Sequence, residues 1–123
     1  MTNILFVDDD HDFANVMKMM LELRDEQQVT IAHSAEIGYE KVLFLIPDVV
    51  IVDMTLPRMQ GVEFVAKLRN TSAVSHIAIV GMSADDKFKA DHQELGMDAF
   101  LLKPFDFSNL QDAIIAALSF RFG

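Results

Sequence analysis

The sequence predicts an α/β protein: a three-layer sandwich in which a five-stranded parallel sheet lies between helices. Two patterns support this prediction. First, five short apolar runs alternate with segments whose apolar residues recur at helical spacing, and such alternation is typical of parallel sheets. Second, the central run Val49 to Val52 is apolar without alternation, as expected for a strand that is buried on both faces.

Each element is predicted from its local pattern. The strands are expected at residues 4–7, 28–32, 49–52, 77–80 and 99–102. Five helices are expected between and after them, around residues 13–21, 35–46, 62–69 and 85–95, and from about residue 107 onwards. Ser34 is the expected N-cap of the second helix, and Asp106 or Ser108 that of the last. Pro47 ends the second helix and Gly96 the fourth.

Composition narrows the functional classes. The formal net charge of −9 argues against direct binding to nucleic acid, which requires clustered Lys and Arg. No apolar run is long enough to span a bilayer, and Met1-Thr2-Asn3 lacks the basic start of a signal peptide. The absence of cysteine fits a reducing compartment. With 123 residues and 51% hydrophobic content, we expect one cytoplasmic domain over residues 1–123, without an output domain.

Polar residues lie at the ends of four of the five apolar runs. Asp8 and Asp9 follow the first, and Asp53 follows the third. Ser83 lies just beyond the fourth, and Lys103 follows the fifth. Ligands of open parallel sheets bind outside the carboxyl ends of the strands, so these side chains are expected to converge. Three close carboxylates repel one another, and a hard divalent cation such as Mg²⁺ would relieve that repulsion.

Such a site suits phosphoryl transfer. Lys103 and Ser83 would neutralise the oxygens of a transferring phosphoryl group. A carboxylate can itself be the nucleophile and form an acyl phosphate. Asp53 is the best candidate, because Asp8 and Asp9 are better placed to hold the metal. Taken singly, the acidic pair and Ser83 have a plainer explanation as helix caps, but the combination is more specific than its parts.

The chain resembles the receiver domain of response regulators, which is the phosphoacceptor half of two-component signalling. The resemblance covers essentially all of the sequence. It rests on four motifs: Asp8-Asp9; Asp53-Met54-Thr55-Leu56-Pro57-Arg58-Met59-Gln60-Gly61; Ser83-Ala84; and Lys103-Pro104-Phe105. The fold that it implies is flavodoxin-like, with strand order 2-1-3-4-5.

The resemblance also implies a role for each site residue. Asp53 would accept a phosphoryl group from a histidine kinase or a histidine phosphotransfer protein, and Lys103 would pair with that group. Asp9, Asp53 and the main-chain carbonyl of Thr55 would ligate Mg²⁺ directly, while Asp8 would act mainly through water. Mn²⁺ is a second candidate for the metal.

The implied signal starts at Ser83, which would swing toward the phosphoryl group, and at Phe100, which would turn inward. Thr is commoner than Ser at the first position, and Tyr is frequent at the second. Thr55 and Asp85 would modulate the lifetime of the phosphate. The face formed by the fourth helix, fifth strand and fifth helix would contact a downstream effector or output domain, and is also the candidate surface for a homodimer. The Lys103-Pro104 bond is often cis in such domains.

Three other interpretations remain open at this stage. A haloacid-dehalogenase-like phosphatase also places an Asp nucleophile, a hydroxyl, a Lys and Mg²⁺ at strand ends. The expected Thr or Val is missing after the acidic residues, where His11 and Asp12 follow, and the chain is short for that fold. A flavin-binding flavodoxin would have a phosphate loop rich in Ser, Thr and Gly after the first strand. A plain acidic scaffold would be indifferent to Mg²⁺.

Overall fold

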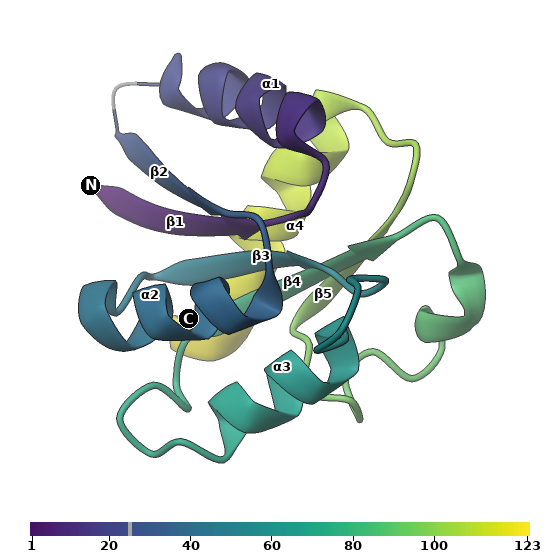
Figure 1. Cartoon of the computed structure of the whole chain (residues 1–123). Coiled ribbons are helices and arrows are strands. Elements are labelled where there is room, and N and C mark those ends of the chain that lie inside the picture. Colours follow the sequence, from purple (N-terminus) through teal and green to yellow (C-terminus); the bar gives the residue numbers. More distant parts are fainter. Residues whose placement is uncertain (25) are drawn as a thin grey trace.

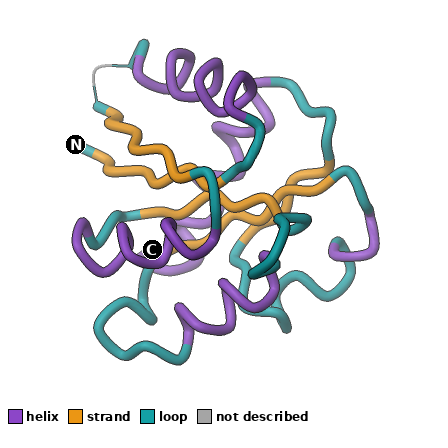
Figure 2. Tube along the Cα trace, in the orientation of Figure 1, coloured by secondary structure: helices purple, strands orange, loops and turns teal. Residues whose placement is uncertain are grey.

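The computed structural model describes residues 1–24 and 26–123. Five strands alternate with helices (Figure 2): β1 Thr2–Val7, β2 Gln27–Ala32, β3 Val49–Asp53, β4 Ala78–Ser83 and β5 Ala99–Leu102. The α-helices are α1 His11–Glu22, α2 Ala35–Leu45, α3 Gly61–Arg69 and α4 Phe107–Phe122. A short 3-10 helix, η1, spans Asp86–Phe88. Among the described residues, no helix combines the length and the apolar character that crossing a bilayer requires.

All five strands are parallel, and their order in the sheet is β2-β1-β3-β4-β5. This confirms the predicted flavodoxin-like topology. Helices α1 and α4 cover one face of the sheet, and α2 and α3 cover the other (Figure 1). The register pairs Val7 with Val52, and Asp53 with Met82. The carboxyl ends of β1, β3 and β4 therefore meet at the same edge of the sheet.

The neighbouring strands β1 and β3 supply side chains to both faces of the sheet. Leu5, Val7, Val50 and Val52 belong to the cluster under α2 and α3. Ile4, Phe6, Val49 and Ile51 belong to the cluster under α1 and α4. Because both faces of β3 are covered, polar alternation would place unpaired polar groups in the core, and this explains the uninterrupted apolar run.

The prediction of a fourth helix over residues 85–95 was wrong. In its place the chain forms η1 and then a series of turns up to Gly96, whose φ is +103°. The backbone hydrogen bonds of this segment do not have the regular spacing of an α-helix. The Lys89 N–H donates to the Asp86 carbonyl, three residues back, and the Met97 N–H donates to the His92 carbonyl, five residues back. In this charged segment Phe88 is the one buried apolar side chain, so packing contributes little to holding a regular helix.

The buried face of α2 consists mainly of small residues. Ser34 is the N-cap, as predicted, and its Oγ accepts the Ile37 N–H at 3.1 Å. The buried residues of this helix are the small ones Ala35 and Gly38 together with Val42. A Cβ on Gly38 would lie 3.1 Å from a methyl carbon of Val7. The helix therefore lies so close to β1 that its larger apolar side chains, such as Ile37, remain largely exposed.

Candidate functional site

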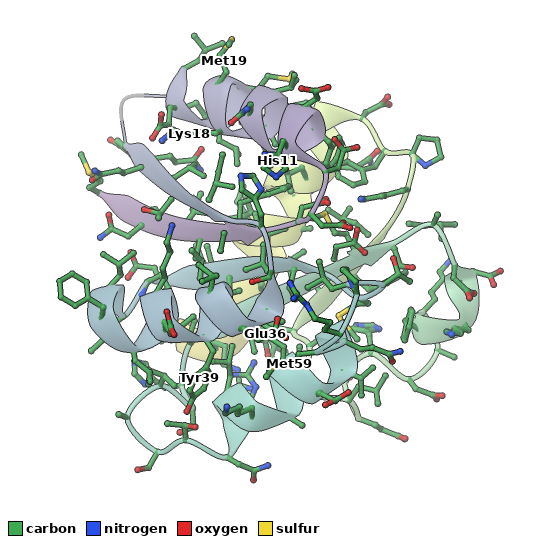
Figure 3. All side chains as sticks on the ribbon, viewed as in Figure 1. His11, Lys18, Met19, Glu36, Tyr39 and Met59 are labelled. Atoms are coloured by element: carbon green, nitrogen blue, oxygen red, sulfur yellow. The ribbon has the colours of Figure 1, made fainter. Side chains whose placement is uncertain are left out.

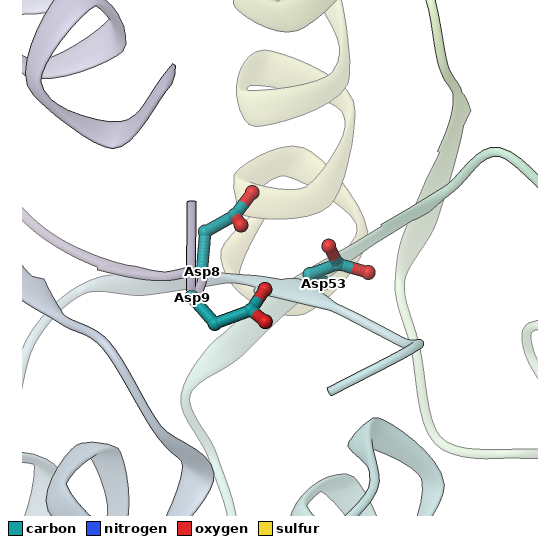
Figure 4. A group of neighbouring side chains, drawn as sticks. All are labelled: Asp8, Asp9 and Asp53. Carbon is teal, nitrogen blue, oxygen red and sulfur yellow. The ribbon is translucent and has the colours of Figure 1, made fainter. Parts of the chain in front are cut away.

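Three carboxylates meet at the carboxyl ends of β1 and β3. Asp8 and Asp9 directly follow β1, and Asp53 is the last residue of β3. Each contributes an oxygen, and these oxygens all lie within 4.8 Å of one another (Figure 4). Asp8 and Asp53 are buried, whereas Asp9 is exposed. The structure thus brings the three predicted acidic residues together in one cluster that is open to solvent on the Asp9 side.

The loop between β1 and α1 explains why Asp9 belongs to the cluster. Asp10 is the N-cap of α1, and its side chain accepts the Phe13 N–H at 3.0 Å. The Asp10 N–H in turn donates to Asp8 Oδ1 at 2.9 Å. Because Asp10 caps the helix, Asp9 is not needed as a cap, and its carboxylate lies beside those of Asp8 and Asp53 (Figure 4).

Lys103, just after β5, provides positive charge to the cluster. Its Nζ donates to Asp8 Oδ2 at 3.1 Å and to Asp53 Oδ2 at 3.2 Å, and it lies 4.6 Å from the ring centroid of Phe13. Burial alone would lower the pKa of Lys103, but the hydrogen bonds and charges of the two aspartates outweigh burial and raise it. Lys103 is therefore fully charged at neutral pH.

The electrostatic balance of the cluster fits a divalent cation. Burial raises the pKa of Asp8, although the Asp10 N–H and Lys103 oppose that rise. One lysine cannot neutralise three ionised carboxylates, so the cluster keeps an excess of negative charge. Hard oxygen ligands on an open rim, with space for water, are the environment that Mg²⁺ prefers. Asp8, Asp9 and Asp53 could therefore hold Mg²⁺.

Both oxygens of Asp53 accept hydrogen bonds. Oδ2 accepts a hydrogen bond from Lys103 Nζ. Oδ1 accepts the Thr55 N–H at 2.9 Å and the Thr55 hydroxyl at 2.7 Å. The family resemblance implied two roles for Thr55, as a metal ligand through its main-chain carbonyl and as a modulator of phosphate lifetime. It did not predict the direct hydroxyl contact, which depends on the turn after β3. These bonds fix the orientation of the carboxylate.

The predicted switch residues Ser83 and Phe100 lie on β4 and β5. Ser83 is fully buried; its carbonyl accepts the Lys103 N–H at 2.8 Å, and its Oγ accepts the Asp85 N–H at 3.0 Å. Asp85 is exposed and caps η1 through the Lys87 N–H. Phe100 is half-buried, with its ring centroid 6.4 Å from that of Phe88. Ser83 thus links the site to the segment that contains η1 and to β5.

An apolar hollow adjoins the acidic cluster. It has a volume of about 380 Å³, and its lining residues are Asp10, Phe13, Ala84, Lys103, Pro104 and Phe105. The Lys103-Pro104 bond is cis. Phe13 and Phe105 form an edge-to-face pair with centroids 6.0 Å apart. The sequence did not predict that the Phe13 ring borders the site, because helical spacing shows only which side of a helix faces the core.

The parallel fold and the cluster at the strand ends define an α/β domain of the receiver type. The family model "Response regulator receiver domain" matches residues 4–115. The chain therefore belongs to the response-regulator receiver family.

Individual relatives agree with this assignment. The KDP operon transcriptional regulatory protein KdpE of Escherichia coli is 34% identical over 119 residues, covering 96% of this chain and 52% of the relative. The response regulator ArlR of Staphylococcus haemolyticus is 30% identical over 118 residues, covering 96% of this chain and 53% of the relative. The chain thus spans about half the length of these relatives. A receiver domain protein from Clostridium thermocellum has a similar structure, with a TM-score of 0.86, 26% identity, and coverage of 97% and 95% of the two chains.

Proposed function

We propose that this domain is a phosphoacceptor of two-component signalling, in which Asp53 receives a phosphoryl group from a histidine kinase or a histidine phosphotransfer protein in the cytoplasm. The observation that carries this proposal is the position of the Asp53 carboxylate. It lies with Asp8 and Asp9 in a cluster whose oxygens are within 4.8 Å of one another, and 3.2 Å from Lys103. Family membership supports the proposal further.

In the proposed transfer, an oxygen of Asp53 attacks the donor's phosphorus, and the bond from phosphorus to the donor's imidazole nitrogen breaks. Asp9, Asp53 and the Thr55 carbonyl would hold Mg²⁺, or Mn²⁺ in its place, with Asp8 acting mainly through water. The bound cation supplies positive charge for the phosphoryl oxygens. Lys103 adds a second positive charge, and the Ser83 hydroxyl a hydrogen-bond donor. No separate enzyme is needed for the transfer to the carboxylate.

Thr55 and Asp85 are the proposed modulators of phosphate lifetime. The Thr55 hydroxyl already contacts Asp53 Oδ1, and Asp85 directly follows the Ser83-Ala84 pair. Both therefore flank the route by which water would reach an acyl phosphate. Autodephosphorylation would be the only hydrolytic activity of the domain. A separate small phosphatase is not favoured, because the chain belongs to the receiver family.

The signal would leave through the output face, which we define as residues 85–96, β5 and α4. Ser83 and Lys103 border this face and would both contact the phosphoryl group. A groove of about 550 Å³ lies on it, lined by residues that include Lys89, Phe100 and Phe105. We propose this face as the contact for a downstream effector or output domain, or for a second receiver in a homodimer. Phosphorylation would shift the population of two states of the face.

The decisive experiment is chemical phosphorylation. The chain is incubated with Mg²⁺ and acetyl phosphate or phosphoramidate and analysed by intact mass, with Asp53→Asn as the control. We expect a single alkali-labile phosphoryl adduct on the native chain and none on the variant. An absent adduct, or equal labelling of Asp53→Asn, would show that Asp53 is not the acceptor.

The output face is tested by beryllofluoride, which mimics the acyl phosphate. With Mg²⁺ present, amide chemical-shift changes beyond the site itself should concentrate in residues 85–96, β5 and α4. The Asp53→Asn variant should show none of these changes. Changes confined to α1 would contradict the proposed route of the signal.

A further inference from the structure

Two histidines lie beside the acidic loop, which is residues 8–10 between β1 and α1, and the proposed chemistry uses neither of them. His11 is the first residue of α1, at the end of the helix that borders the site (Figure 3). His33 follows β2. Their rings are stacked face to face, with centroids 3.6 Å apart and planes inclined by 6°. Residues 22 positions apart in the sequence therefore connect two neighbouring loops at the carboxyl edge of the sheet.

The ring of His33 also contacts the main chain of the acidic loop. Its Nδ1 lies 3.1 Å from the carbonyl oxygen of Asp8. A carbonyl oxygen only accepts, so Nδ1 must carry the hydrogen and donate it. The N–H of Asp8 donates to the Ala32 carbonyl at 3.0 Å. The His33 side chain thus continues the pairing of β1 and β2 beyond the point where both strands end.

These two contacts hold the acidic loop at both of its ends. The Asp8 carbonyl is held by the His33 donor, and the His11 ring is held by the stack. Asp9 lies between them and is exposed. Within residues 1–24 and 26–123, no side-chain hydrogen bond or ion pair restrains the Asp9 carboxylate. The position of this carboxylate therefore depends on the backbone of the loop, and hence on His33.

We propose that His33 is a positioning residue for the metal site: it orients the acidic loop through the Asp8 carbonyl and so raises the affinity for Mg²⁺. This inference rests on the proposed function, since it takes Asp9 as a metal ligand. Partners that hold metal ligands directly typically change affinity 10- to 100-fold when removed. His33 acts through the main chain, so we expect a smaller loss, about 3- to 10-fold.

Two substitutions separate the hydrogen bond from the ring stack. His33→Phe keeps an aromatic ring beside His11 but removes the donor. His33→Asn removes the ring but places an amide nitrogen on Cγ, where Nδ1 stands in histidine. If the hydrogen-bond donor positions the loop, His33→Asn should keep the Mg²⁺ affinity that His33→Phe loses. His11→Phe, which keeps the stack and does not touch the Asp8 carbonyl, is the matched control.

The readout is the dissociation constant for Mg²⁺, measured by calorimetry on the folded chains at one pH and ionic strength. Urea unfolding without Mg²⁺ gives the stability of each variant separately. We expect His33→Phe to bind Mg²⁺ about 3- to 10-fold more weakly, and His33→Asn and His11→Phe to stay within about twofold of wild type. A merely structural role would change the unfolding midpoint and leave the Mg²⁺ affinity unchanged.

The outcomes distinguish this inference from the proposed function. If the wild-type chain binds no Mg²⁺, the proposed function fails. If wild type binds Mg²⁺ and His33→Phe binds it equally well, His33 is not a positioning residue. If His33→Phe and His33→Asn lose affinity equally, the hydrogen bond is not the cause and the inference is overturned.

Discussion

At the scale of single residues, Lys103 decides whether the acidic cluster is stable without a metal. Its ammonium is the one cation that forms ion pairs with Asp8 and Asp53 among the residues that the structure describes. Asp8 is completely buried, and a buried carboxylate without a partner destabilises the folded state. The lysine and a metal ion are therefore alternative sources of positive charge for the same carboxylates.

We predict that Lys103→Met lowers the free energy of unfolding by about 1–3 kcal/mol in the absence of metal, because buried carboxylate oxygens lose their partner. Added Mg²⁺ should recover more stability in this variant than in wild type, since the less neutralised cluster binds the cation more tightly. Urea unfolding followed by circular dichroism, with and without Mg²⁺, measures both effects. Lys89→Met, at an exposed lysine, is the control. Equal stabilisation by Mg²⁺ in all three chains would contradict this prediction.

At the scale of elements, the edge strand β2 is closed by side chains from the two helices that flank it. The Val29 N–H donates to Glu22 at 2.9 Å, and Lys18 donates to the Val29 carbonyl at 2.5 Å. On the other side, Lys41 donates to the Ile31 carbonyl at 2.7 Å. Open strand edges tend to pair with other chains, so these contacts protect the edge from such pairing.

Glu22 makes this protection dependent on pH. The hydrogen bond from the Val29 N–H, together with Lys18, lowers the pKa of Glu22 in the folded chain. A lowered pKa stabilises the fold above the unfolded pKa of about 4.3, and this stabilisation is lost as the pH falls through the folded pKa. We predict that Glu22→Gln lowers the free energy of unfolding by up to about 1 kcal/mol at pH 7, and that the difference shrinks as the pH falls below the unfolded pKa.

Urea unfolding of wild type and variant across this pH range is the measurement. Glu40→Gln makes the same change at an exposed position of α2 and should show a smaller difference at every pH. A difference for Glu22→Gln that is the same at pH 7 and pH 3 would contradict the role of its charge.

At the scale of the whole molecule, two charged clusters lie at opposite ends of the parallel strands. The acidic cluster lies at the carboxyl ends, and the cluster around Asp98 lies at the amino ends. Asp98 lies just before β5 and is buried. It accepts hydrogen bonds from the Ile79 N–H at 2.8 Å, from Arg69 at 2.9 Å and from Arg121 at 2.8 Å. Burial lowers the pKa of Arg69, an effect that the charge of Asp98 partly offsets. This cluster ties the ends of α3 and α4 to the sheet, far from the candidate metal site.

The separation of the two clusters predicts that stability and metal binding can be changed independently. Asp98→Asn should lower the free energy of unfolding by about 3 kcal/mol, because it leaves two arginines without their buried counter-charge. The Mg²⁺ affinity of the folded chain should stay within about twofold of wild type. Urea unfolding and calorimetry test the two parts, with Asp91→Asn as the exposed control. A parallel loss of Mg²⁺ affinity would show that the two clusters are coupled.

The sequence by itself determined the strand order, through the family resemblance, and the residues that converge on the site. Apolar runs, helical spacing and caps such as Ser34 depend on neighbours within a few positions, so they can be recognised without coordinates. The convergence of Asp8, Asp9, Asp53 and Lys103 also follows from the sequence, because each lies at the carboxyl end of a parallel strand and those ends share one edge.

Only the tertiary structure decided the contacts between distant segments. Residues 85–96 form turns and η1 because too few of their side chains are buried to hold a longer helix. The stack of His33 on His11 and the ion pairs of Asp98 join parts of the chain that no local pattern relates. Such contacts depend on how closely helices and loops approach the sheet, and that distance is set by packing of the whole core.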